Sequence, residues 1–161
     1  MNTIEALKKR LNLNKLVVQK EEGYVAEEVF KFNPPASKDE IAKLPPYVPT
    51  EIMEFLSQHN GADLFDHPEN GGGTHLFSVE EILEHIDIWE CPEYFIPIGY
   101  GMDSAWIACQ VDEKSKENYM WIGSFLDFED EDEFWKLPMD FPTWLDRFIV
   151  CQGCSFWDWT R

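Results

Sequence analysis

Basic residues are missing from a long central stretch of the chain. Between Leu44 and Glu113, 70 residues pass without one Lys or Arg, and the same stretch carries 14 Asp and Glu. The whole chain has 31 acidic residues against 13 basic ones, which gives a formal net charge of -18. An anionic field of this strength repels nucleic-acid phosphates and anionic membranes, and it attracts basic partners. The charge therefore predicts a basic protein as partner and argues against nucleic acid and membrane.

Long apolar runs are also absent. No segment reaches the roughly 18 apolar residues of a transmembrane helix. The charges at Glu5, Lys8, Lys9 and Arg10 are not followed by an apolar stretch of the length found in secretory signals. We therefore expect a cytoplasmic protein.

Cysteine is scarce, with four residues at positions 91, 109, 151 and 154. A domain of this length does not need disulfide bonds, so we expect reduced thiols, two or more of them buried. Cys151 and Cys154 have the C-x-x-C spacing of redox pairs and of half zinc sites. A zinc site needs about four ligands, and no second pair of suitable spacing follows. We interpret the two thiols as packed at a helix end, and we expect no metal and no cofactor.

No complete catalytic motif is present. Gly71-Gly72-Gly73-Thr74 lacks the Lys of a phosphate-binding loop, and Gly99-Tyr100-Gly101 lacks the third glycine of a dinucleotide site, so both are interpreted as turns. Glu81 and His85 are one helical turn apart, which favours an ion pair on a helix surface over a metal site. No serine lies in a nucleophile elbow. These absences predict a protein without catalytic residues, not an enzyme.

Apolar residues, by contrast, are plentiful. They make up 44% of the chain, and aromatics 15%, which is too much for acidic disorder and indicates a packed core. Periodicity and capping signals predict one α+β domain over 1–161, with a central antiparallel sheet flanked by helices. The expected helices are a short one opened by Thr3 and others near 37–44, 51–59, 79–86 and 142–151. The expected strands are 15–19, 24–32, 94–98, 105–111 and 119–124.

One segment combines acids with aromatics. Six acids occupy seven positions, at Asp127, Glu129, Asp130, Glu131, Asp132 and Glu133. Trp121 and Trp135 flank this run, so the acids could form a charged rim around aromatic anchors in a partner interface. Three other interpretations remain open: a solvated loop, a calcium site without the spacing of an EF-hand, and aromatics that face the core.

The order of several short motifs resembles the SUKH superfamily, which includes fungal Smi/Knr cell-wall regulators and many bacterial immunity proteins. The matching motifs are Pro35-Ala36-Ser37, Leu44-Pro45, Phe55-Leu56, His59-Asn60-Gly61, Ile96-Pro97-Ile98-Gly99 with Asp103, and Trp144-Leu145 with Arg147-Phe148. They cover roughly 33–150, which leaves an N-terminal helix and strands in 1–32 and a C-terminal tail in 151–161. The resemblance implies helices around an antiparallel sheet and a non-enzymatic role. That role would be an immunity protein that neutralises a cognate basic toxin, often a nuclease, by direct binding. The alternative is a scaffold or regulatory adaptor of the cell-wall-regulator type.

Overall fold

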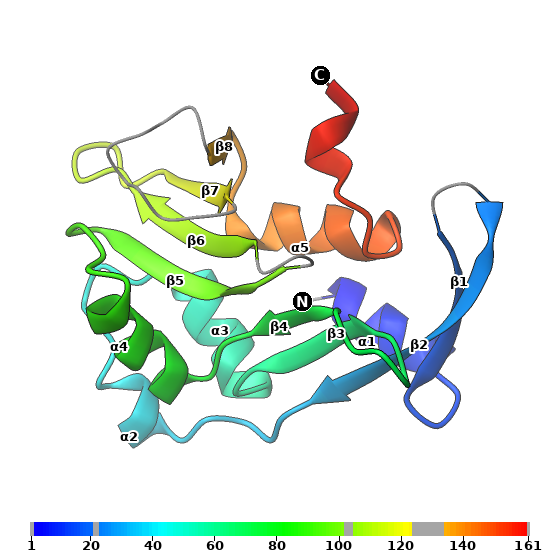
Figure 1. Ribbon diagram of the computed structural model, residues 1–161. Helices are drawn as coiled ribbons and strands as arrows, with labels where there is room; N and C mark the ends of the chain where they lie inside the picture. Colours follow the sequence, from blue (N-terminus) through cyan, green and yellow to red (C-terminus); the bar gives the residue numbers. More distant parts are fainter. Residues whose placement is uncertain (1, 21–22, 102–104, 124–133, 161) are drawn as a thin grey trace.

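The computed structural model of the protein describes residues 2–20, 23–101, 105–123 and 134–160 (Figure 1). Its helices are α1 (Asn2–Arg10), α2 (Lys38–Ile41), α3 (Thr50–Gln58), α4 (Val79–Ile88), α5 (Phe141–Val150) and the 3₁₀ helix η4 (Phe156–Thr160). Its strands are β1 (Lys15–Gln19), β2 (Val25–Phe32), β3 (Ala62–Asp66), β4 (Thr74–Leu76), β5 (Phe95–Tyr100), β6 (Trp106–Val111), β7 (Asn118–Gly123) and β8 (Phe134–Leu137). None of the described helices is both long enough and apolar enough to cross a membrane.

The eight strands form one antiparallel sheet, and their order in the sheet is their order along the chain. The helices are inserted between strands: α2 and α3 precede β3, α4 precedes β5, and α5 follows β8. Figure 1 shows α1, α3 and α5 gathered together, with α4 packed along β5. The prediction of one α+β domain with an antiparallel sheet flanked by helices is therefore confirmed.

Two capping boxes begin helices where the sequence predicts them. In α2 the hydroxyl of Ser37 accepts from the backbone N–H of Glu40, while the Glu40 carboxylate accepts from the backbone N–H of Ser37. Ser78 and Glu81 make the same exchange at α4. Each box satisfies backbone donors that have no partner inside the helix. The helix expected over 37–44 is shorter, because the chain turns at Ala42 ahead of Pro45, whose ring disfavours helix in the residue before it.

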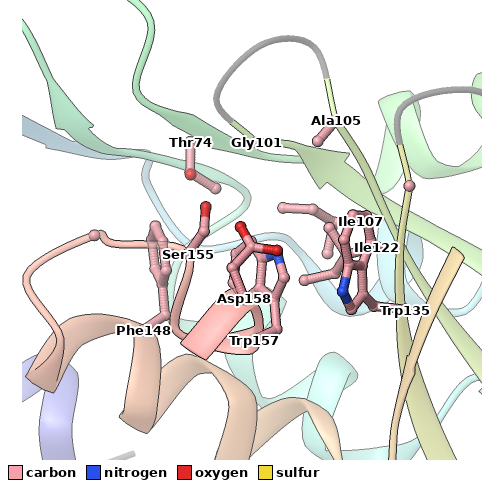
Figure 2. Close-up of a pocket in the computed structure, with 12 residues that line it drawn as sticks. Thr74, Gly101, Ala105, Ile107, Ile122, Trp135, Phe148, Ser155, Trp157 and Asp158 are labelled. Carbon is pink, nitrogen blue, oxygen red and sulfur yellow. The ribbon is translucent and has the colours of Figure 1, made fainter. Parts of the chain in front are cut away.

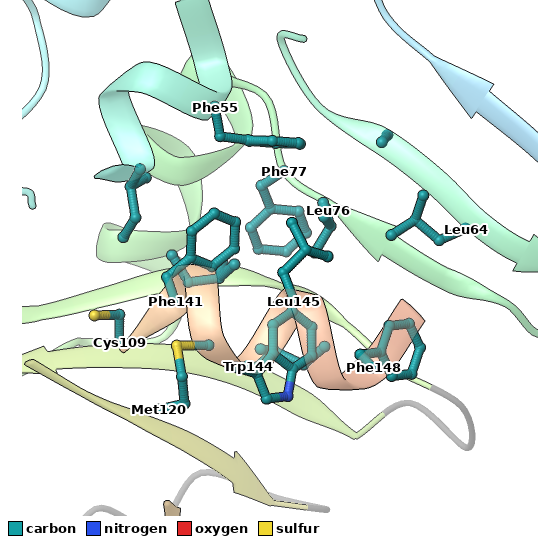
Figure 3. Close-up of a cluster of buried hydrophobic side chains, with 14 of the residues drawn as sticks. Phe55, Leu64, Leu76, Phe77, Cys109, Met120, Phe141, Trp144, Leu145 and Phe148 are labelled. Carbon is teal, nitrogen blue, oxygen red and sulfur yellow. The ribbon is translucent and has the colours of Figure 1, made fainter. Parts of the chain in front are cut away.

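The core lies between the sheet and α5 (Figure 3). Trp144 and Leu145 of α5 are almost fully buried, and Cys109 of β6 and Met120 of β7 have no exposed surface. In Figure 3, Trp144 lies on the Met120 side of the helix, while Leu145 points toward Leu76 and Phe77. The rings of Phe141, Trp144 and Phe148 stack in series along the helix, with centroids 6.2 and 5.3 Å apart. The apolar stripe predicted for this helix is therefore the stripe that closes the core.

Some expectations about the strands are wrong. β3, β4 and β8 were not predicted, and η4 lies in the segment that was interpreted as a tail. Gly99 does not lie in a turn, because it sits inside β5 at an irregularity in the pairing with β6. A Cβ atom at Gly99 would lie 2.0 Å from the carbonyl oxygen of His75 in β4. Glycine is needed there because two backbones approach closely, and not because the chain reverses.

Candidate partner-binding surfaces

Trp121 lies on the face of the sheet away from α5. In the antiparallel register Trp121 is opposite Ala108 and Lys136, so these three share one face. The indole N–H of Trp121 donates to Gln110 Oε1 at 3.0 Å, and its ring lies 5.6 Å from Phe95. The Lys136 ammonium lies 5.3 Å from the Trp121 ring and 4.7 Å from the Tyr119 ring. Trp121 is thus a half-buried aromatic on a polar surface, held in a fixed orientation.

The acidic helix α4 covers part of the same face. Trp89, the C-terminal cap of α4, stacks on Trp106 with ring centroids 3.7 Å apart. Trp106 is two residues from Ala108 in β6, so both side chains lie on the same side of the sheet as Trp121. The solvent side of α4 carries Glu80, Glu84 and Asp87, all exposed. Glu90 and Glu93 follow in the link to β5 and are exposed as well. Acidic side chains and a half-buried aromatic therefore lie on one face of the sheet, which we call the acidic face.

Trp135 lies on the opposite face. It is the register partner of Ile122, whose side chain points into the core beside Ile107. Trp135 lines a cavity of about 200 Å³ between the sheet and the C-terminal segment. Figure 2 shows Ile107, Ile122 and Trp135 on the sheet side of this cavity, across from Ser155, Trp157 and Asp158. Trp121 and Trp135 therefore do not share a surface.

The six acids Asp127, Glu129, Asp130, Glu131, Asp132 and Glu133 lie outside the described residues. Their assignment to a partner interface stays a prediction. The described acids of the acidic face are a different set, contributed mainly by α4. They belong to the stretch between Leu44 and Glu113 that lacks Lys and Arg.

His75 is placed between two carboxylates. Its Nδ1 lies 2.6 Å from Asp63 Oδ1 and its Nε2 lies 2.9 Å from Glu81 Oε1, so one ring joins β3, β4 and α4. Burial acts to lower the pKa of His75, but the hydrogen bonds to Asp63 and Glu81 outweigh it and raise the pKa. Burial acts to raise the pKa of Glu81, but hydrogen bonds from Ser78 and His75 lower it. The raised pKa of His75 favours the imidazolium form between the two carboxylates.

The expected ion pair between Glu81 and His85 is wrong. The ring of His85 contacts the backbone carbonyl of Glu81 through Nδ1 and the hydroxyl of Tyr100 through Nε2, both at 2.8 Å. The His85 ring also stacks on Phe77 with centroids 4.2 Å apart. The Glu81 carboxylate turns instead toward its own cap and His75, because the capping box fixes its direction.

Sequence comparison supplies relatives but no activity. No family model and no solved structure matches the chain. YnaB of Bacillus subtilis (strain 168) is 31% identical over 134 residues, which cover 80% of this chain and 87% of YnaB. The chain belongs to the family of YnaB. YobM of the same organism is 35% identical over 120 residues, or 70% of this chain and 62% of YobM, so the chain spans less than two thirds of YobM. Both relatives are described as uncharacterized proteins.

The cysteines of this YnaB-family chain form no disulfide. Cys109 is buried, while the thiols of Cys91, Cys151 and Cys154 are half-buried, so the expectation of two or more buried cysteines is wrong. Burial raises the pKa of Cys91 and of Cys109 to about 12. Cys151 caps α5, as expected for a helix-end thiol. Within residues 2–20, 23–101, 105–123 and 134–160, no three His, Cys, Asp or Glu side chains group closely enough to bind a metal ion.

Sequence reasoning missed the His75 group and the cavity of this YnaB-family chain. Asp63 and His75 are register partners in β3 and β4, and neither strand was predicted. The signal that could have found them is the pair of apolar residues, Ala62 and Leu64, on either side of Asp63, followed by the glycines at 71–73. The cavity depends on η4 folding back onto the sheet, which no local pattern indicates.

Proposed function

We propose that the chain is a non-enzymatic binding protein that neutralises a basic protein, a cognate toxin such as a nuclease, in the manner of SUKH immunity proteins. The observation that supports this function is the acidic face, where the exposed Glu80, Glu84 and Asp87 lie on the same side of the sheet as the half-buried Trp121. Charged rims around aromatic anchors are a common design of high-affinity interfaces. A basic toxin would meet both features on one side of the sheet.

The mechanism has two steps. The negative field first steers the basic partner, which can raise association rates by about 10–10³ at low salt. The aromatic cluster around Trp121 then supplies contact area that excludes water. The bound chain occludes the active site of the toxin, so no chemistry by this chain is required. The net charge of -18 also disfavours competing nucleic acid at the same surface.

The order of elements supports a SUKH-type assignment. In the part of the chain that carries the resemblance, a capped α2 and the longer α3 come first. A second capped helix precedes the β5–β6–β7 strands, and the aromatic α5 closes the core. These are the positions of the motifs that carry the resemblance. The same fold would serve a scaffold or regulatory adaptor. That second candidate is favoured by YobM, which extends beyond the part that matches this chain.

The test is genetic and biochemical. The reading frame beside the gene for this chain should encode a basic protein that inhibits growth when it is expressed alone. Co-expression with this chain should restore growth, and the two purified proteins should form a stable complex. A neighbour that binds without being toxic would favour the adaptor. A neighbour that neither binds nor inhibits growth would contradict the immunity proposal.

A further inference from the structure

A second cavity continues the one lined by Trp135. It measures about 440 Å³ and shares three lining residues, Gly153, Ser155 and Asp158, with the first cavity. Its other walls come from the β1–β2 hairpin, through Lys20, Tyr24 and Glu28, and from the loop between β3 and β4. The two cavities together form a groove along the C-terminal segment, which we call the C-terminal groove.

Glu28 gives this groove a buried carboxylate. The residue is 2% exposed, and its Oε1 lies 2.8 Å from the ammonium of Lys20. Its Oε2 is buried and accepts no hydrogen bond from any of the residues that the structure describes. Buried carboxylate oxygens are normally hydrogen-bonded, because the loss of water must be compensated. An additional donor at Oε2 would complete the site.

The charged groups of the groove favour a cation. Lys20 is the one Lys or Arg among the lining residues that the structure describes, and it is paired with Glu28. Asp158 is exposed at the junction of the two cavities and has no ion pair within the described parts of the chain. The Nδ1 atom of His67 accepts from the backbone N–H groups of Glu69 and Asn70. Among the described residues, the lining therefore carries two carboxylates and one ammonium.

The first cavity supplies aromatic walls. Trp135 and Trp157 line it from opposite sides, and Trp157 stacks on Phe148 with centroids 6.4 Å apart. The faces of indole rings attract cations and also pack against methylene groups. A long side chain with a cationic end fits such a groove better than an anion or a purely apolar group.

We propose that the C-terminal groove, on the side of the sheet opposite the acidic face, binds the guanidinium group of an arginine side chain from a second contact segment of the basic partner. Its methylene stem packs against Trp135 and Trp157, and its donors reach Asp158 and the Oε2 of Glu28. A guanidinium carries five N–H donors in a planar fork, which lets it bridge two carboxylates. This inference rests on the proposed function for the source of the arginine, whereas the chemistry of the groove can be tested without any partner.

The experiment follows the indole N–H signals in NMR while Nα-acetyl-arginine amide is added to the full chain. The signals of Trp135 and Trp157 should shift, while Trp121 on the acidic face should not. The citrulline analogue, which has the same shape without the charge, should bind at least about tenfold more weakly, as should the arginine probe to Asp158→Asn. Glu28→Gln should weaken binding as well. Glu27→Gln is the matched control, because Glu27 is the exposed neighbour on the other face of β2.

The possible results test the groove assignment and the proposed function separately. Equal binding of arginine and citrulline probes, or unchanged binding by Asp158→Asn, would overturn the groove assignment. So would shifts confined to Trp121. If the arginine probe binds as expected but the toxin is neutralised equally well by wild type and Asp158→Asn, the assignment of the arginine to the toxin is wrong while the immunity function stands. If the arginine probe binds as expected but no basic protein does, the groove remains and the immunity function is wrong.

Discussion

The two faces of the β6–β7–β8 sheet use their aromatic residues in opposite ways. On the α5 side, Trp144, Phe141 and Leu145 are at most 1% exposed, and Cys109 and Met120 of β6 and β7 have no exposed surface. On the α4 side, Trp121 stays half-buried under Lys136, on the same face of the sheet as a helix whose solvent side is acidic. The first arrangement excludes water completely, and the second leaves aromatic surface within reach of a partner.

This difference predicts that residues on the α5 side, which we call the closed face, contribute mainly to folding stability, and that residues on the acidic face contribute mainly to partner binding. A residue in the closed face contributes through the surface and packing it loses on unfolding, whatever partner is present. A residue in the acidic face makes fewer contacts within the chain, so its removal should affect a complex more than the fold. Substitutions on the two faces should therefore give different patterns of unfolding and binding data.

The largest expected effect is on the closed face. Leu145→Ala removes a branched side chain from a site with almost no exposed surface, and it should lower the free energy of unfolding by about 2–5 kcal/mol. Trp121→Ala should cost about 1 kcal/mol, because its site is partly open to water. Urea denaturation of both variants checks this. Equal losses of unfolding free energy in the two variants would show that side chains on the two faces contribute equally to stability.

The next effect concerns the complex with the basic partner. If Trp121 is an anchor, Trp121→Ala should speed dissociation by about 30-fold, which corresponds to a loss of about 2 kcal/mol. Val17→Ala is the control, because Val17 is an exposed apolar residue of β1, away from the acidic face. The measurement is surface-immobilised binding kinetics at one salt concentration. An unchanged dissociation rate for Trp121→Ala would remove Trp121 from the interface.

Local signals explain which parts of the fold were predictable. The capping boxes at Ser37 and Ser78 depend on residues three positions apart, so the sequence alone identifies them. The stripe in α5 repeats at helical spacing, and the β6–β7 hairpin is joined by a polar turn. Each of these predictions uses contacts between residues that are close in the sequence, and each is confirmed.

Non-local pairing explains what was missed. β3 and β4 are short and flank a glycine loop, and β8 follows the acidic run, so their strand character comes from the neighbours they pair with. The opposite orientation of Trp121 and Trp135 depends on the β7–β8 register, since a shift of one residue would reverse it. His85 pairs with Tyr100 for a similar reason, because α4 must first pack on β5.

A smaller effect is expected from the charges of α4. The triple variant Glu80→Gln, Glu84→Gln, Asp87→Asn should slow association by about tenfold at low salt and flatten the salt dependence, with little change in dissociation. The control removes three exposed acids elsewhere, by Glu27→Gln, Glu54→Gln and Glu69→Gln. Stopped-flow association at two salt concentrations distinguishes the sets. The same decrease in association rate for both triple variants would mean that association depends on the total charge and not on the charges of the acidic face.

The smallest effect compares two histidines in different surroundings. His75 lies between Asp63 and Glu81, and its pKa is raised. Burial, followed by the Lys8 ammonium 2.7 Å from its Nε2, lowers the pKa of His59. A raised pKa gives stability that is full below the ordinary value of about 6.5 and is lost as the pH rises through the folded-state value. A lowered pKa gives the reverse, with stability that is present above about 6.5 and lost as the pH falls.

Relative to wild type, the stabilities of the His75 and His59 variants should therefore change in opposite directions with pH. His75→Gln should cost most near pH 5.5 and least near pH 8.5, by less than about 1 kcal/mol, because about a third of each side chain in the group is exposed. Asp63→Asn should reduce the same pH dependence, since it removes one of the two carboxylates. His59→Gln should instead improve stability at pH 5.5 relative to pH 8.5. The measurement is the free energy of unfolding in urea at both pH values. Parallel shifts in His75→Gln and wild type across this range would show that the imidazolium between two carboxylates does not contribute to stability, and that the β3–β4–α4 junction depends on packing alone.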